Sequence, residues 1–153
     1  SRRQRQMCIR ERVGEGMTGV CANERVTKEM LEQLCTITDS FGRTELVPER
    51  LMDVVSAVSG SSPAYVFMFI EAMADAAVAQ GMARKQAYSF AAQAVLGAAK
   101  LVLETGKHPG ELKDMVCSPA GTTIEGVRAL ERAGMRSAVY EALQACADKG
   151  KRL

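Results

Sequence analysis

Aromatic side chains are scarce in this sequence: tryptophan is absent, and only three tyrosines and four phenylalanines occur among 153 residues. A core built without large rings relies on alanine, methionine, leucine and valine, which favour closely packed helices. The length corresponds to one domain with a sizeable core. The apolar content of 47% excludes a disordered chain.

Paired cysteines and clustered histidines are lacking as well. The five cysteines are odd in number, widely spaced and without a C-x-x-C pair, and His108 is the only histidine. This pattern argues against a disulfide framework and against a zinc site. We therefore expect reduced thiols, a cytoplasmic protein and no bound metal. No nucleophile-elbow motif supports a Ser-His-Asp triad.

A basic surface is missing from most of the chain. The net charge is +2, but residues 1–12 hold five arginines and one glutamate, which leaves −2 on the remainder. A nucleic-acid surface is therefore not expected. Residues 1–12 also lack the apolar run of a signal peptide or a membrane span. We interpret them as a disordered or artefactual head foreign to the domain, with a basic tail as the alternative.

Short apolar runs and turn residues mark residues 13–50 as a strand, a helix and a second strand. Residues 13–22 predict the first strand. The helix is expected to have Thr27 as its N-cap and Gly42 just beyond its end, and residues 43–47 predict the second strand. Two strands are too few for a sheet with its own core, so we interpret this segment as the end of a larger α/β domain.

From residue 49 onward the apolar spacing is helical to the end of the chain. A short helix over 49–58 is expected to break at the sequence SGSS, after which Ser62 would cap a helix that begins with Pro63. The other predicted helices cover 84–104, a short segment after Pro109, 123–133 and 136–149.

The predicted helices over 63–80 and 84–104 are apolar on most of their surface. Glu71 and Asp75 interrupt the first, which argues for a buried helix and against a membrane span. Two such helices need more cover than this chain supplies, so we expect a helical core shared between subunits. A dense monomeric bundle is the alternative.

The segment KDMVCSPAGTTIEGV, residues 113–127, gathers small and hydroxyl residues just before a helix. Ala120 and Gly121 would let a ligand approach the backbone closely. The amides of Thr122 and Thr123 are among the unpaired donors of a helix N-terminus, where the dipole favours an anion such as a small carboxylate. Hydroxyls that only cap the helix are the alternative. The loop holds no acid, base or metal cluster, so the chemistry would come from a cofactor and from positioning.

Three segments together resemble pyrroline-5-carboxylate reductase, and the resemblance covers about residues 13–150. They are SGSSPAYVFMFIEAMADA at 59–76, AAQAVLGAAKLVLETGKHPGELKDMV at 91–116 and CSPAGTTIEGVRALE at 117–131. The resemblance implies a dinucleotide-binding domain followed by an all-helical domain that pairs into a homodimer, often stacked into a higher ring. It implies hydride transfer from NADPH or NADH to the C=N carbon of 1-pyrroline-5-carboxylate, which gives L-proline.

The same resemblance implies roles for individual residues. Thr123 falls where the family has a threonine close to the imine nitrogen, suited to a catalytic role in hydrogen-bonding or protonating it. Ser61 would lie near the nicotinamide as a cofactor contact. Substrate contacts are implied for Val116, Ser118, Gly121, Thr122 and Thr123.

The main departure from the family is the absence of the G-x-G-x-x-G/A turn that carries the coenzyme pyrophosphate. We therefore expect a mainly α fold: a helical dimerisation and substrate-binding domain at 51–153, preceded by a strand–helix–strand remnant of a Rossmann-like α/β domain at 13–50. Without the main coenzyme-binding domain, the chain is expected to be inactive alone. Ala120 stands where the family commonly has glycine.

Two other functions stay open. One is a non-enzymatic helical dimerisation or ligand-binding module. The other is a different dehydrogenase with a catalytic lysine on a helix, for which Lys100 and Lys113 are the candidates, although neither sits in such a motif. In each case we expect the partners to be a second copy and a small molecule, with no nucleic acid and no membrane.

Overall fold

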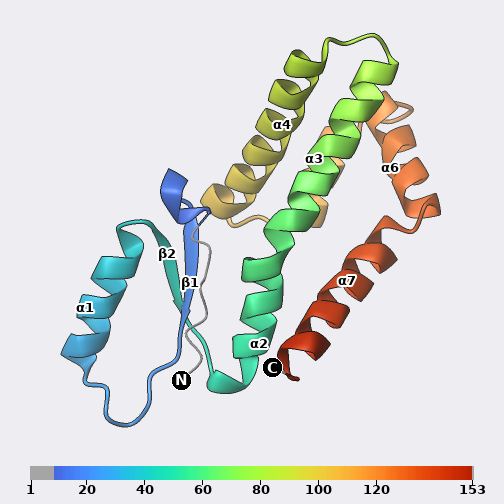
Figure 1. Cartoon of the computed structure of the whole chain (residues 1–153). Coiled ribbons are helices and arrows are strands. Elements are labelled where there is room, and N and C mark those ends of the chain that lie inside the picture. The colour runs from blue at the N-terminus through green and yellow to red at the C-terminus, as the bar shows by residue number, and fades with distance from the viewer. Residues whose placement is uncertain (1–8, 153) are drawn as a thin grey trace. The chain divides into compact units, whose positions relative to one another are not determined.

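A computed structural model describes residues 9–152 as a largely helical protein with one small parallel sheet (Figure 1). The predicted fold class, mainly helical with a strand–helix–strand segment at its start, is confirmed. Two compact units make up the chain: Ser1–Gly60 together with Ala147–Leu153, and Ser61–Cys146. Residues 1–8 of the predicted head lie outside the described residues.

The first unit contains two parallel strands joined by a helix. Its elements are η1 (Glu11–Val13), β1 (Gly16–Val20), α1 (Lys28–Asp39), β2 (Gly42–Leu46), η2 (Glu49–Leu51) and α2 (Met52–Val55). The strands pair from Gly16 opposite Gly42 to Val20 opposite Leu46. At the start of this ladder the backbones lie so close that a Cβ on Gly42 would overlap the carbonyl of Gly16. Glycine is therefore required there by the close approach of two strands.

Helix α1 begins as the sequence predicts and ends differently. The Thr27 hydroxyl accepts the Met30 N–H at 3.3 Å, which confirms the predicted N-cap. In the same turn, two hydrogen bonds lower the pKa of Glu29 below its ordinary value. The larger effect comes from the backbone N–H of Glu29 itself and the smaller one from the Thr27 hydroxyl. The helix ends with Ser40 as its C-cap. The prediction that Gly42 caps α1 is wrong, because Gly42 is already the first residue of β2.

The predicted break at SGSS is also wrong. Instead of ending, the helical backbone continues from α2 through a π-helical turn, η3 (Ser56–Ser61), directly into α3 (Ser62–Ala79). Ser62 is therefore a helical residue and not an N-cap. The sequence signals for a break, two serines and a glycine before a proline, mark a widened helical turn here.

The second unit is entirely helical in the described residues. It contains α3, α4 (Arg84–Thr105), α5 (Pro109–Val116), α6 (Thr122–Arg132) and most of α7 (Met135–Gly150). Helices α3 and α4 form an antiparallel hairpin and lie side by side (Figure 1). Three buried alanines, Ala74 of α3 and Ala87 and Ala91 of α4, belong to these two helices. Since Ala87 and Ala91 are four residues apart, they lie on one face of α4, where small side chains let the helices approach closely.

Two polar contacts hold these helices in place. At the α3–α4 turn, Arg84 forms an ion pair with Asp75, and its guanidinium lies 5.7 Å from the centre of the Tyr88 ring. Near the other end of α3, the Tyr65 hydroxyl lies 2.6 Å from the Cys146 Sγ of α7. This hydrogen bond raises the pKa of Tyr65 above its ordinary value.

The large apolar side chains of α3 and α4 point outward. Within residues 9–152 no large side chain is completely buried, and Met68 and Phe90 are each 67% exposed. The prediction of a buried helix at 63–80 therefore does not hold within a single chain. By length and composition alone the helical run Glu49–Ala79 could cross a membrane, a test that core helices of soluble proteins also pass. These surfaces need cover from outside the described chain.

We expect Ala87→Leu to lower the free energy of unfolding by about 1–3 kcal/mol, because the larger side chain would push α3 and α4 apart. Urea unfolding followed by circular dichroism measures this. Ala92→Leu is the matched control, since Ala92 is an exposed residue of the same helix. Equal stability of the two variants would contradict close packing through Ala87.

Candidate functional site

The predicted site residues 116–123 run from the last residue of α5 to the first two residues of α6. His108 caps the start of α5, where its Nδ1 accepts the Gly110 N–H at 3.0 Å, so the single histidine has a structural role. At the other end of α5, the Cys117 N–H donates to the carbonyl of Asp114 at 3.0 Å. The short helix is thus fixed at both ends and holds the start of the loop.

The loop itself is a tight turn over Ser118–Gly121. The Gly121 N–H donates to the Ser118 carbonyl at 3.0 Å, and Ala120 has a φ of 57°. Proline at the second position, a positive φ at the third and a hydrogen bond from fourth to first residue are the features of a type II turn. This turn reverses the chain directly before α6.

Ala120 is the only non-glycine residue with positive φ among the described residues. Its Cβ makes the left-handed conformation unfavourable by roughly 1–2 kcal/mol, and glycine is the usual residue at this position of a type II turn. The alanine that replaces the family's usual glycine at position 120 therefore has to adopt a backbone conformation that glycine adopts more easily. The turn keeps its shape although the residue at position 120 opposes it.

Gly121 has little free space beside its Cα. Its φ of −76° and ψ of 168° are open to any residue, but a Cβ there would overlap the Ser118 hydroxyl and lie 3.1 Å from the Ser118 carbonyl oxygen. The Ser118 side chain therefore lies directly against the backbone at the start of α6. This contact brings a hydroxyl close to the first amides of that helix.

The N-terminus of α6 has no side-chain cap. Gly121 occupies the N-cap position and offers no acceptor, so the first amides, those of Thr122, Thr123 and Ile124, lack intrahelical partners. The one acidic residue of the first turns, Glu125, pairs with Arg128 at 3.3 Å. The observed end is therefore suited to an anion. The alternative, in which the threonines cap their own helix, is not what the structure shows.

The structure brings five of the six predicted site residues together and leaves one apart. Val116, Ser118, Gly121, Thr122 and Thr123 follow one another along this connection, and all but Gly121 are exposed in the single chain. Ser61 is the last residue of the π-helical turn before α3. In the described part of the chain no hydrogen bond joins it to the 116–123 segment.

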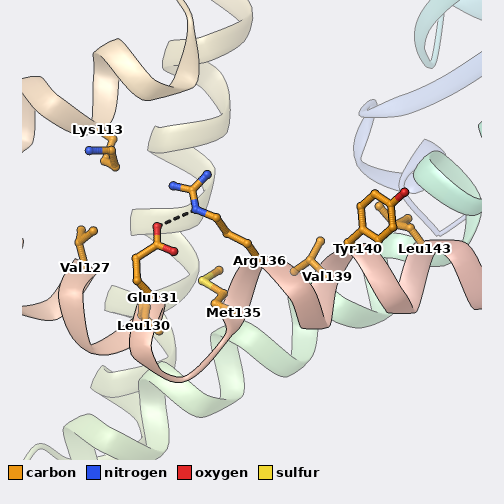
Figure 2. Close-up of a pocket in the computed structure, with 9 residues that line it drawn as sticks. All are labelled: Lys113, Val127, Leu130, Glu131, Met135, Arg136, Val139, Tyr140 and Leu143. Carbon is orange, nitrogen blue, oxygen red and sulfur yellow. Dashed lines mark hydrogen bonds and ion pairs between the residues drawn. The ribbon is translucent and has the colours of Figure 1, made fainter.

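An apolar groove lies on the next helices, and the sequence did not reveal it as one surface. Figure 2 shows side chains from α5, α6 and α7 around a cavity of about 530 Å³. The turn at Gly134, with φ 77°, joins α6 to α7, and Arg136 donates to Glu131 at 2.6 Å across it. The cavity is lined by Lys113, Val127, Leu130, Glu131, Met135, Arg136, Val139, Tyr140 and Leu143.

This groove offers little to a reacting substrate. Its charged side chains form ion pairs, Arg136 with Glu131 and Lys113 with Asp114. The hydrogen bond to Asp114 raises the pKa of Lys113. None of the six predicted site residues lines it. The helical spacing of Val127 and Leu130, and of Val139 and Leu143, was the signal for two apolar helix faces. The turn at Gly134 places the apolar faces of α6 and α7 next to each other, so that both line the groove.

The fold and the site define a class: a helical domain that follows the end of a parallel α/β domain and presents an uncapped helix N-terminus behind a type II turn. The sequence profile described as "Pyrroline-5-carboxylate reductase dimerisation" matches residues 49–153. The chain therefore belongs to the pyrroline-5-carboxylate reductase dimerisation family.

Individual relatives agree with this assignment. The chain is 60% identical over 141 residues to the pyrroline-5-carboxylate reductase of Escherichia coli strain K12, covering 92% of this chain and 52% of the relative. The solved reductase of Coxiella burnetii matches with a TM-score of 0.88 and 35% identity, over 92% of this chain and 52% of that one. The Plasmodium falciparum enzyme, solved with NADP bound, matches with a TM-score of 0.85 and 32% identity, over 94% of this chain and 58% of that one. The chain spans about half the length of the curated relatives it matches.

We expect Ala120→Gly to raise the free energy of unfolding by about 1 kcal/mol, because glycine removes the cost of the left-handed conformation. Thermal or urea unfolding measures the change. Ala129→Gly, in the interior of α6, is the control and should lower stability by about 1 kcal/mol. Destabilisation by both variants would contradict the positive φ at position 120.

Proposed function

We propose that this chain is the helical half of an NAD(P)H-dependent enzyme that reduces 1-pyrroline-5-carboxylate to L-proline. The observation that carries the proposal is the uncapped start of α6 behind the Ser118–Gly121 turn, in a chain of the reductase dimerisation family. A small carboxylate substrate fits this end because it brings the negative charge that the unpaired amides and the helix dipole favour.

Each site residue has a part in this proposal. The amides of Thr122 and Thr123 and the Ser118 hydroxyl hold the substrate carboxylate, Gly121 keeps space for it, and the exposed Val116 covers the apolar ring. The Thr123 hydroxyl donates a hydrogen bond to the imine nitrogen and so directs a proton to it. A bound nicotinamide coenzyme would supply the hydride.

We propose that the start of α1 does not hold the pyrophosphate of that coenzyme. The turn before α1 lies where a dinucleotide fold would offer free amides, but Thr27 already accepts the Met30 N–H there. The lowered pKa of Glu29 also keeps a negative charge in the first turn of α1, which opposes a phosphate. Among the described residues we assign only Ser61 to the coenzyme, as a contact on the nicotinamide side. We therefore propose that the reductase needs a further dinucleotide-binding segment.

We propose a homodimer, formed through the apolar surfaces of α3, α4 and the groove in Figure 2. The family profile, described as a dimerisation family, supports this. Stacking of dimers into a ring stays a prediction from the resemblance. Cys21, Cys35, Cys117 and Cys146 are all unbridged, which supports a reducing, cytoplasmic compartment.

The activity is tested by joining residues 13–153 to the part of the Escherichia coli relative that this chain does not cover. With substrate present, we expect the chimera to oxidise NADPH or NADH and the isolated chain to oxidise neither. Thr123→Val in the chimera should lower kcat about 100-fold, because the imine nitrogen loses its proton donor. Thr36→Val, on the exposed side of α1, is the matched control. A folded chimera without activity would contradict the proposed reaction.

Self-association is tested by light scattering of residues 13–153 over a dilution series. We expect a dimer, and we expect Met68→Glu to weaken it at least 100-fold, because the new charge would be buried against the partner without a counter-ion. Thr36→Glu introduces the same charge on α1 as a control. A stable monomer of the unmodified chain would contradict the shared helical core.

A further inference from the structure

The helical run from Met52 to Ala79 contains one irregular turn, and its cause is visible in the sequence. Residues Ser56–Ser61 are π-helical, with α-helix on both sides. A π turn adds one residue to a helical turn and is rare except at functional sites. Its position next to the family segment SGSSPAY calls for a local physical explanation.

Pro63 provides that explanation. In a continuous α-helix the N–H of residue 63 would donate to the carbonyl of Ser59, but proline has no N–H, and its ring would collide with that carbonyl. The turn that ends two residues before Pro63 is widened, and a wider turn gives the Ser59 carbonyl more room beside the ring. Pro63 therefore opposes the α-helical register at this point.

The upstream side of the π turn has its own anchor. The guanidinium of Arg10 donates to the Ser59 hydroxyl at 2.8 Å, and Ala57 is buried, with 3% of its surface exposed. The downstream side is anchored by Tyr65, whose hydroxyl lies 2.6 Å from Cys146 Sγ. Between these anchors lies Gly60, where an added Cβ would meet nothing within 4 Å. The widened turn is thus held at its two ends.

Ser61 closes the π turn and has an uncommitted hydroxyl. The residue is half-buried, and in the described part of the chain its hydroxyl makes no hydrogen bond and does not cap α3. If the same residues formed an α-helical turn, the hydrogen-bond register would shift by one residue, which corresponds to a rotation of about 100° around the helix axis. The direction of the Ser61 hydroxyl therefore depends on the π turn.

We propose that Pro63 is a positioning residue of the reductase site: it holds Ser56–Ser61 in π-helical form and so keeps the Ser61 hydroxyl directed at the nicotinamide side of the bound coenzyme. This inference rests on the proposed function for the role of Ser61. The π turn itself, and its dependence on Pro63, do not rest on that function. The two parts can be measured separately.

The structural part is tested by amide hydrogen exchange on the 153-residue chain with Pro63→Ala. The new N–H at position 63 should bond to Ser59, exchange at residues 59–62 should slow at least tenfold, and the melting temperature should rise, because the proline ring and its missing N–H oppose a continuous α-helix. Pro109→Ala is the matched control, since Pro109 is the first residue of α5 and the three residues before it are not helical. Unchanged exchange around Pro63 would overturn the proposal.

The functional part is tested in the chimera with the Escherichia coli segment, which keeps Pro63, Ser61 and the Tyr65–Cys146 contact but not Arg10. Pro63→Ala should raise the KM for NADPH about tenfold and leave the KM for the imine within twofold, and Ser61→Ala should reproduce this pattern without altering exchange. A stabilised Pro63→Ala variant with unchanged KM for NADPH would overturn the positioning role. An inactive parent chimera would refute the proposed reaction, while the exchange experiment would still decide whether Pro63 holds the π turn.

Discussion

The close packing of α3 against α4 through alanine is the constraint on which the rest of the helical unit depends. Small residues such as Ala74, Ala87 and Ala91 let two helices approach closely, but they bury little apolar surface. The larger side chains, among them Phe67, Met68 and Phe90, are left on the outside. Because apolar burial is the main stabilising term in folding, a unit built this way is incomplete until something covers its outer faces.

The same constraint explains why a single chain gives an open site. The 116–123 segment is shaped by local interactions alone: the cap at His108, the turn hydrogen bond from Gly121 to Ser118 and the contact of Ser118 with Gly121. These interactions fix the direction of the amides but do not exclude water, and most of the segment is exposed. Electrostatic interactions with an anion are much weaker in water than in a dry site. The proposed second copy and the dinucleotide-binding segment would supply the missing walls.

Features fixed by local chemistry could be predicted from the sequence, and features fixed by contacts between distant residues could not. Thr27 caps α1 as its sequence indicates, whereas the sequence left open whether hydroxyl residues cap α6, which the structure shows without a side-chain cap. The end of α1 was misjudged because Gly42 is needed opposite Gly16, a contact across 26 residues. The SGSS segment was misjudged because a widened turn and a helix end use the same residue types before a proline. The left-handed φ of Ala120 could not be predicted, because alanine does not favour that conformation.

The N-termini of α1 and α6 have opposite chemistry. At α1, Thr27 occupies the Met30 amide, and the ionised Glu29 places a negative charge in the first turn. At α6, Gly121 leaves the amides open, and Glu125 is paired with Arg128. An anion would be opposed at the first and stabilised at the second. This contrast supports the proposal that the substrate carboxylate binds at α6, and it gives no support to a phosphate site at α1.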